Sequence, residues 1–177
     1  VFSIKKLMKS KGNIVFLGMM GSGKTSIAKL VSKKIGLDFL DIDQTIENKF
    51  GMTISKIFSE KGEDYFRKIE EKVTLDILKR KKNVIALGGG GFLNKSIRDE
   101  IIKNHLSFWL NNSAKILINR IKNSKKRPLA FNATTNELIN LIEKRSNIYS
   151  KALYKVNCDN LTKIQITKKI VNILSKE

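Results

Sequence analysis

Residues 18–25 have the types and spacing needed to bind a phosphate group. They read Gly-Met-Met-Gly-Ser-Gly-Lys-Thr and match the pattern G-x-x-x-x-G-K-[ST]. The glycines let backbone N–H groups turn toward an anion, Lys24 can reach the β- and γ-phosphates, and the Thr25 hydroxyl can bind Mg²⁺. The alternative is an ordinary glycine-rich turn. The pattern predicts a site for a nucleoside triphosphate. The residues expected to bind it are Gly21, Ser22, Gly23, Lys24, Thr25 and Ser26.

Two carboxylates, Asp41 and Asp43, stand at and just beyond the end of the segment 37–41, which is expected to be a strand. Along an extended segment these side chains point in opposite directions, so that one can face a metal and the other an acceptor. A magnesium–nucleotide complex needs a nearby carboxylate, usually through water. A hydroxyl acceptor needs a group that orients it and takes its proton. The alternative is a pair of aspartates that cap a helix beginning near Gln44.

Four consecutive glycines occupy residues 88–91. Such a segment lets a ligand lie directly on backbone N–H groups; a flexible loop is the alternative. Arginines are also informative, because the chain has only six among its 35 basic residues, and lysine cannot offer a planar pair of donors. Arg67 can pair with Glu70 on one helix face, either as part of a site or as a solvated ion pair. Arg127 lies in a polar loop and could move onto a transferring phosphoryl group, or could simply be one of the loop's basic residues.

The elements that must position these residues alternate between strands and helices. Strands are expected at 13–17, 37–41, 83–87, 106–110 and 155–158, and helices at 24–35, 44–50, 55–59, 63–80, 94–103, 114–122, 136–149 and 162–176. This order predicts a parallel sheet covered by helices on both faces. Ligands of such sheets bind beyond the carboxyl ends of the strands. The phosphate loop, the two aspartates and the glycine segment all follow strands, so we expect them to meet.

Composition sets limits on function. A chain of 177 residues with 41% hydrophobic and 29% charged residues is typical of one soluble domain. It has no apolar run of about eighteen residues, so no membrane partner is expected. The single cysteine favours the cytoplasm. The net charge of +19 comes from scattered lysines without interleaved aromatic residues, so we expect no specific nucleic-acid partner, only nonspecific binding at low salt. Side chains without an assigned function are His105 at a helix end, Cys158 in the core, and Arg80 and Arg98 at the surface.

Taken together, the motifs resemble those of the shikimate kinase family. They are the phosphate loop, Asp-Ile-Asp at 41–43, Glu-Asp-Tyr-Phe-Arg with the following Ile-Glu-Glu at 63–71, Leu-Gly-Gly-Gly-Gly at 87–91 and Arg-Pro-Leu at 127–129. The resemblance extends from about residue 13 to 174. It implies a P-loop NTPase fold like that of nucleoside monophosphate kinases, a three-layer α/β sandwich with sheet order 2-3-1-4-5. It also implies ATP- and Mg²⁺-dependent phosphorylation of the 3-hydroxyl of shikimate, in chorismate and aromatic amino-acid biosynthesis.

The resemblance also implies roles for individual residues. Asp43 would hold the shikimate hydroxyls and accept the proton, while Lys24 and Arg127 would stabilise the transferring phosphoryl group. Thr25 would bind Mg²⁺ directly and Asp41 through water. The substrate-binding residues would be Arg67 and Arg145 for the carboxylate, Glu70 to hold these arginines, the N–H groups of Gly89 and Gly90, and the apolar Ile54, Phe58, Phe66, Pro128 and Leu129. Arg120 would pack on adenine, residues 123–135 would form a lid, and about 43–79 would bind shikimate within a single domain of residues 1–177. We expect a monomer.

Two other functions fit the same residues. A related small-molecule kinase, acting on gluconate or a nucleoside monophosphate, would share the fold and the phosphate loop. A catalytically idle P-loop module would bind a nucleotide without transferring its phosphate. The presence of Lys24, Thr25, Asp41, Asp43 and Arg127 together argues against the idle module, which would be free to lose some of them.

Overall fold

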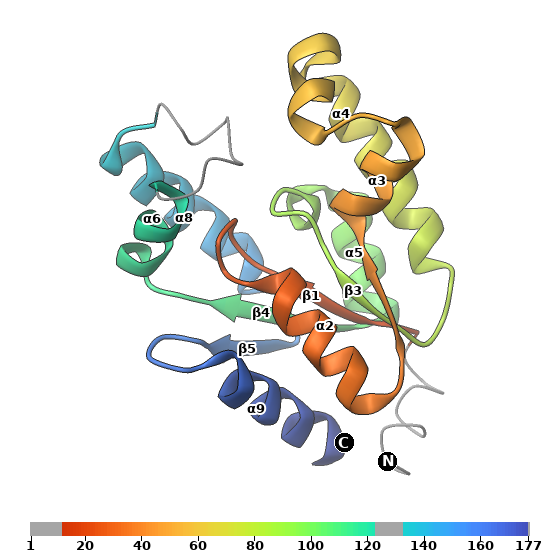
Figure 1. Ribbon diagram of the computed structural model, residues 1–177, viewed down its shortest axis with the longest axis vertical. Coiled ribbons are helices and arrows are strands. Elements are labelled where there is room, and N and C mark those ends of the chain that lie inside the picture. Colours follow the sequence, from red (N-terminus) through yellow and green to blue (C-terminus); the bar gives the residue numbers. More distant parts are fainter. Residues whose placement is uncertain (1–11, 123–132, 177) are drawn as a thin grey trace.

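Five parallel strands form the centre of the protein (Figure 1). The computed structural model describes residues 12–122 and 133–176. The strands are β1 (Ile14–Leu17), β2 (Asp38–Asp41), β3 (Asn83–Ala86), β4 (Leu106–Asn111) and β5 (Tyr154–Asn157). Their order in the sheet is β2-β3-β1-β4-β5. The predicted fold class and strand order are therefore confirmed, and the strand ends differ from the predicted ones by one residue.

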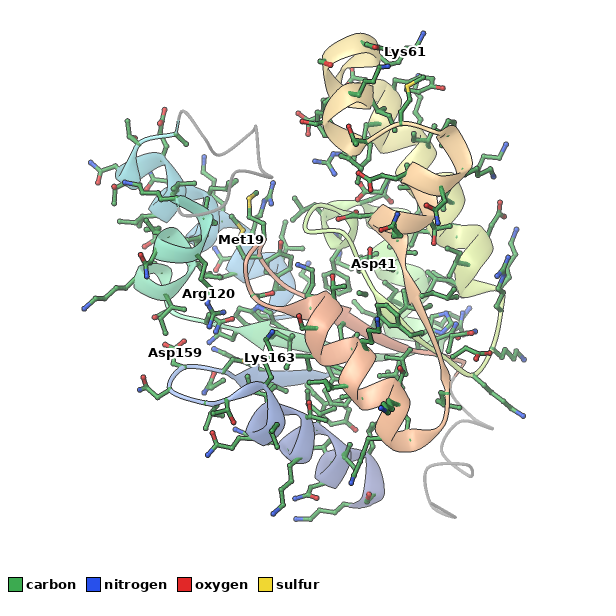
Figure 2. The ribbon with its side chains drawn as sticks, viewed as in Figure 1. Met19, Asp41, Lys61, Arg120, Asp159 and Lys163 are labelled. Atoms are coloured by element: carbon green, nitrogen blue, oxygen red, sulfur yellow. The ribbon has the colours of Figure 1, made fainter. Side chains whose placement is uncertain are left out.

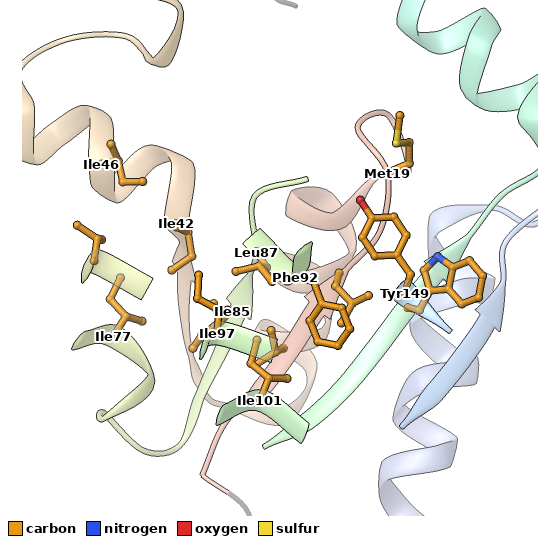
Figure 3. Close-up of a cluster of buried hydrophobic side chains, with 14 of the residues drawn as sticks. Met19, Ile42, Ile46, Ile77, Ile85, Leu87, Phe92, Ile97, Ile101 and Tyr149 are labelled. Carbon is orange, nitrogen blue, oxygen red and sulfur yellow. The ribbon is translucent and has the colours of Figure 1, made fainter. Parts of the chain in front are cut away.

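Helices cover both faces of the sheet, because successive residues of the central strands point to opposite faces. In β1, Ile14 and Phe16 join one buried cluster and Val15 and Leu17 the other. The first cluster is covered by α2 (Lys24–Ile35) and α9 (Lys163–Lys176), which lie side by side in Figure 1. The second, shown in Figure 3, is covered by α3 (Ile42–Phe50), α4 (Ile54–Leu78), α5 (Lys95–Asn104), α6 (Ala114–Lys122) and α8 (Thr135–Tyr149).

The segment after β2 differs from its prediction. We expected Asp41 and Asp43 to alternate along an extended segment, but α3 already begins at Ile42. The cause is local: the Asp41 side chain accepts a hydrogen bond from the N–H of Gln44 at 3.2 Å and so caps the helix. Asp43 therefore lies in the first helical turn instead of on a strand.

The two helices predicted at 55–59 and 63–80 are both present as the two halves of α4, which bends at Gly62 between them. Thr53 caps its start, and Gly62 interrupts it with φ 81° and ψ 170°, a conformation that favours glycine. The bend separates a first half that carries Phe58 from a second half that carries Arg67 and Glu70. Both halves contribute to the candidate site described below.

His105 and Arg98, which were expected at a helix end and at the surface, make hydrogen bonds with other parts of the chain. His105 ends α5 as predicted, but its side chain is buried, and its Nδ1 accepts a hydrogen bond from the N–H of Asn13 at 3.0 Å. Arg98 is not a free surface charge. It donates to the carbonyls of Phe92 and Leu93, at 3.1 and 2.9 Å, and so holds the 3₁₀ turn η1 (Gly91–Leu93). This turn continues the glycine segment, so Arg98 supports the site indirectly.

Asn112, just after β4, provides a test of the core. It is 6% exposed, and within the described residues neither its Nδ2 nor its Oδ1 has a hydrogen-bond partner. Leucine has a similar shape and leaves no polar atom unpaired. We expect Asn112→Leu to raise the free energy of unfolding by about 1–2 kcal/mol, measured by urea denaturation. The matched control is Asn83→Leu, which should destabilise the protein because the Asn83 amide donates to Asn13 and Lys81. Equal losses in both variants would contradict the prediction.

Candidate active site

The phosphate loop joins β1 to α2 in a conformation that needs its glycines. Gly23 precedes the first residue of α2 with φ 91°. At Gly18, a Cβ would lie 2.8 Å from the carbonyl oxygen of Leu110, so no side chain fits there. Lys24 folds across the loop, and its Nζ donates to the carbonyls of Gly18 and Met19 at 2.9 and 3.0 Å. The loop therefore holds its ammonium group at the start of α2, where backbone N–H groups also favour an anion.

Thr25 and Asp41 form the pair expected at a magnesium site. The Thr25 hydroxyl donates to Asp41 Oδ2 at 2.7 Å, while Asp41 Oδ1 caps α3. Asp41 thus satisfies both alternatives drawn from the sequence, since it caps a helix and faces the phosphate loop. A hydroxyl and a carboxylate are hard oxygen ligands, and Mg²⁺ is usually bound by one or two such groups together with water and nucleotide phosphates. The residues present fit that ion.

Asp43, in the first turn of α3, lies between charged groups of both signs. Burial raises its pKa from 3.8 to about 6, and Asp41, Glu70 and Glu47 contribute in the same direction, while Lys24 lowers it. Its Oδ1 would lie 2.5 Å from a Cβ placed on Gly88. Asp43 is therefore packed against the glycine segment, and its ionisation is sensitive to its surroundings.

Arg67, in the second half of α4, is held between two carboxylates and two aromatic rings. Its Nη1 donates to the buried Glu70 at 2.7 Å, and its Nε and Nη2 donate to Glu63 at 3.1 and 2.9 Å. Its guanidinium carbon lies 5.2 Å from the ring centroid of Phe66 and 5.9 Å from that of Phe58. Glu63 received no role from the sequence, although its position four residues before Arg67 was a usable signal.

The glycine segment is where these elements meet. A Cβ on Gly88 would also lie 2.8 Å from Glu70 Oε1, and one on Gly90 would overlap the guanidinium of Arg67. At Gly89, a Cβ would lie 3.9 Å from Nη1 of Arg145. Gly88 and Gly90 are therefore required because side chains from α3 and α4 occupy the space where a Cβ would lie, whereas a Cβ at Gly89 would make only ordinary contacts. Gly88 was not among the predicted site residues, and its contacts could not be read from the sequence.

Arg145 reaches this segment from α8. Its Nη1 lies 3.8 Å from Met19 Sδ, and its Nε is buried without a hydrogen-bond partner among the described residues. Burial raises the pKa of Glu70, and the charges of Arg67 and Arg145 oppose that increase. Glu70 thus accepts a hydrogen bond from Arg67 and interacts with the charge of Arg145, while its role in holding both arginines stays a prediction. Tyr149, one turn after Arg145, was missed by the sequence analysis.

The remaining predicted residues fall into two groups. Arg120 on α6 donates to the carbonyl of Gly21 at 3.0 Å, and Figure 2 shows Arg120 and Asp41 on either side of the loop that carries Met19. Its packing on adenine stays a prediction. Arg127, Pro128 and Leu129 lie outside the described residues, as does most of the predicted lid. The end of the predicted lid is described: Thr134 caps α8 and Thr135 is its first residue.

Comparisons with known proteins agree with this geometry. A model of the shikimate kinase family matches residues 20–175. A shikimate kinase of Thermodesulfovibrio yellowstonii is 41% identical over 160 residues, 90% of this chain and 92% of that protein. A shikimate kinase of Bacillus subtilis is 41% identical over 170 residues, 92% and 88% of the two chains. A solved shikimate kinase from Acinetobacter baumannii, in complex with shikimate, is 30% identical with a TM-score of 0.88, covering 97% of this chain and 98% of that one. This chain therefore belongs to the shikimate kinase family.

Proposed function

We propose that this protein transfers the γ-phosphoryl group of ATP to the 3-hydroxyl of shikimate, which yields shikimate 3-phosphate and ADP within aromatic amino-acid biosynthesis. The observation that carries the proposal is the grouping of Arg67, Arg145 and Asp43 around one glycine segment. Shikimate is an anionic polyol. It needs cations for its carboxylate, and a carboxylate and backbone groups for its hydroxyls, and these are the groups that surround residues 88–90.

Each residue of the site has a task in this reaction. Arg67 and Arg145 bind the substrate carboxylate and orient the ring, with Phe58 and Phe66 against its apolar side. Asp43 in its carboxylate form accepts the proton of the attacking hydroxyl. Lys24 stabilises the negative charge that develops on the transferring phosphoryl group. Thr25 and Asp41 would hold Mg²⁺, which neutralises charge on the β- and γ-phosphates when it is bound.

Further parts of the proposal come from the predicted lid and from the arrangement of the site. Arg127 is proposed to assist Lys24, and a lid of residues 123–135 to exclude water, which would otherwise compete as the acceptor. Asp43, Arg67 and Arg145 meet within one chain, which supports a monomeric enzyme. Cys158 is a buried free thiol, which is compatible with the cytoplasm. In the described part of the chain, no helix is long and apolar enough to cross a membrane.

The function is tested by measuring ADP release from Mg-ATP with and without shikimate, in a coupled assay. Gluconate, CMP and AMP serve as alternative acceptors in parallel reactions. Strong stimulation by shikimate alone is the expected result. Stimulation by another acceptor would keep the phosphate site but overturn the assignment of the acceptor pocket. ATP binding without stimulation by any acceptor would favour the idle module.

Arg145→Ala should mainly weaken shikimate binding. Removing a charged donor pair from a buried site commonly costs about 2–3 kcal/mol, so we expect the KM for shikimate to rise about 30- to 150-fold while the KM for ATP changes little. Arg80→Ala is the control, because Arg80 is exposed beyond the end of α4. An unchanged shikimate KM in Arg145→Ala would reject the role of Arg145 in binding the carboxylate.

A further inference from the structure

Tyr149, the last residue of α8, connects this helix to the glycine segment. Its side chain is 1% exposed, and its hydroxyl donates to the carbonyl of Gly89 at 2.5 Å. The ring belongs to the second buried cluster and lies 6.1 Å from the ring of Trp109, centroid to centroid. Figure 3 shows the hydroxyl on the side of the ring that faces Met19.

The hydroxyl is the part of this side chain that packing alone does not explain. A phenylalanine would fill the same volume, and a buried hydroxyl is favourable only when it has a partner. Burial raises the pKa of Tyr149, so the phenol stays neutral and can donate its proton to the Gly89 carbonyl. The contact joins residues 60 positions apart in the chain. It is therefore a tertiary hydrogen bond between two separate elements.

The glycine segment needs such an external support. Its residues carry no side chains that restrict the backbone, and the N–H of Gly91 donates to the carbonyl of Gly88 at 3.0 Å, which leaves Gly89 between them. Gly88 and Gly90 are packed against Asp43, Glu70 and Arg67 from α3 and α4. At Gly89 the support comes from α8, through Tyr149, and the same helix carries Arg145 one turn earlier.

We propose that Tyr149 is a positioning residue for the acceptor substrate. Its hydrogen bond ties the backbone of the glycine segment to the helix of Arg145, and so sets the separation between the groups that bind the substrate hydroxyls and the group that binds its carboxylate. This inference rests on the proposed function. It predicts that the Tyr149 hydroxyl affects the affinity for the acceptor substrate and leaves the affinity for the nucleotide unchanged. Lys24 and Thr25 are positioned by the phosphate loop and by Asp41 instead.

The test is Tyr149→Phe, which keeps the ring and removes the hydrogen bond. We expect the KM for shikimate to rise about five- to tenfold, the range for one lost buried hydrogen bond, while the KM for ATP stays within about twofold. Shikimate binding without nucleotide is followed by the fluorescence of Trp109, the single tryptophan of the chain. Its dissociation constant should rise by the same factor as the KM.

Two control variants separate positioning from general stability. Tyr154→Phe removes a hydroxyl from β5, where the partly buried Tyr154 packs against the other cluster, and Ile142→Val loosens the core along α8 itself. Both should leave the shikimate dissociation constant unchanged. The inference is overturned if Tyr149→Phe binds shikimate like the unmodified protein. It is equally overturned if both KM values rise together and kcat falls in step with a lowered Tm.

The same experiment distinguishes failure of the proposed function from failure of the role of Tyr149. If the unmodified protein does not turn over shikimate, the proposed function fails and this inference fails with it. If turnover is normal and Tyr149→Phe is unaffected, the inference alone is rejected and the proposed function stands.

Discussion

Replacing Lys24 with alanine is expected to lower kcat by about 10²- to 10³-fold, with a much smaller change in the KM for shikimate. Its ammonium group lies across the phosphate loop, 2.9 and 3.0 Å from the carbonyls of Gly18 and Met19. A cation held there interacts most strongly with the charge that develops as the phosphoryl group is transferred. Losing one preorganised donor of this kind has an effect of that size.

Kinetics with saturating Mg-ATP and shikimate measure this effect. Lys29→Ala is the matched control, because Lys29 is an exposed residue of the same helix and should retain full activity. A kcat within about fivefold of the unmodified value in Lys24→Ala would contradict the electrostatic role. Lys24 also lowers the pKa of Asp43, so its removal raises that pKa and should shift the acid limb of the pH–rate profile to higher pH.

The substitution Asp43→Asn is expected to have a second large effect. It should lower the activity and raise the stability of the protein. Asparagine cannot accept the proton of the substrate hydroxyl, so we expect kcat to fall by about 10²- to 10⁴-fold. Asparagine also carries no charge that must be buried beside Asp41, Glu70 and Glu47. The variant should therefore be less active and, without ligands, more stable than the unmodified protein.

The pH dependence of this stability difference follows from the pKa of Asp43. Burial raises it from 3.8 to about 6, so between these values the folded protein binds this proton more tightly than the unfolded chain does. The free energy of unfolding therefore falls as pH rises through that range, and the loss is complete above about pH 6.5. We expect Asp43→Asn to be more stable by about 1–2 kcal/mol at neutral pH, a value reduced for solvent screening of this half-buried group. Near pH 4 the two proteins should be about equally stable.

Thermal unfolding at several pH values tests this, with nucleotide absent and EDTA present, because a bound cation would lower the pKa of Asp43. Asp38→Asn serves as the control, since Asp38 is exposed at the start of β2 and its removal should have no such pH-dependent effect. Equal stability of Asp43→Asn and the unmodified protein at all pH values would show that the burial of this carboxylate has no energetic cost.

Local patterns determined the phosphate loop and the elements around it. Five strands and the helices between them are found where residue type and periodicity predicted them. The buried face of a strand or helix produces a regular spacing of apolar residues, which can be read from the sequence. The strand order and the assignment of Arg67, Glu70 and Arg145 to a shared site came from the family resemblance. The early start of α3 was missed because Asp41 both ends β2 and caps α3 with its side chain. An aspartate at the end of a strand can either continue the extended chain or cap a helix, and its residue type does not decide between the two.

Other parts of the site were decided by tertiary structure alone. Gly88 lies between Asp43 and Glu70, Arg120 bonds to Gly21 on the phosphate loop, and Tyr149 bonds to Gly89. These partners are distant in the chain, and the residues next to each one do not indicate which partner it contacts. Their contacts depend on how α3, α4, α6 and α8 pack around the sheet. The chemical groups of the site could be named from residue types and spacing, whereas their contacts with the glycine segment depend on the packing of those helices.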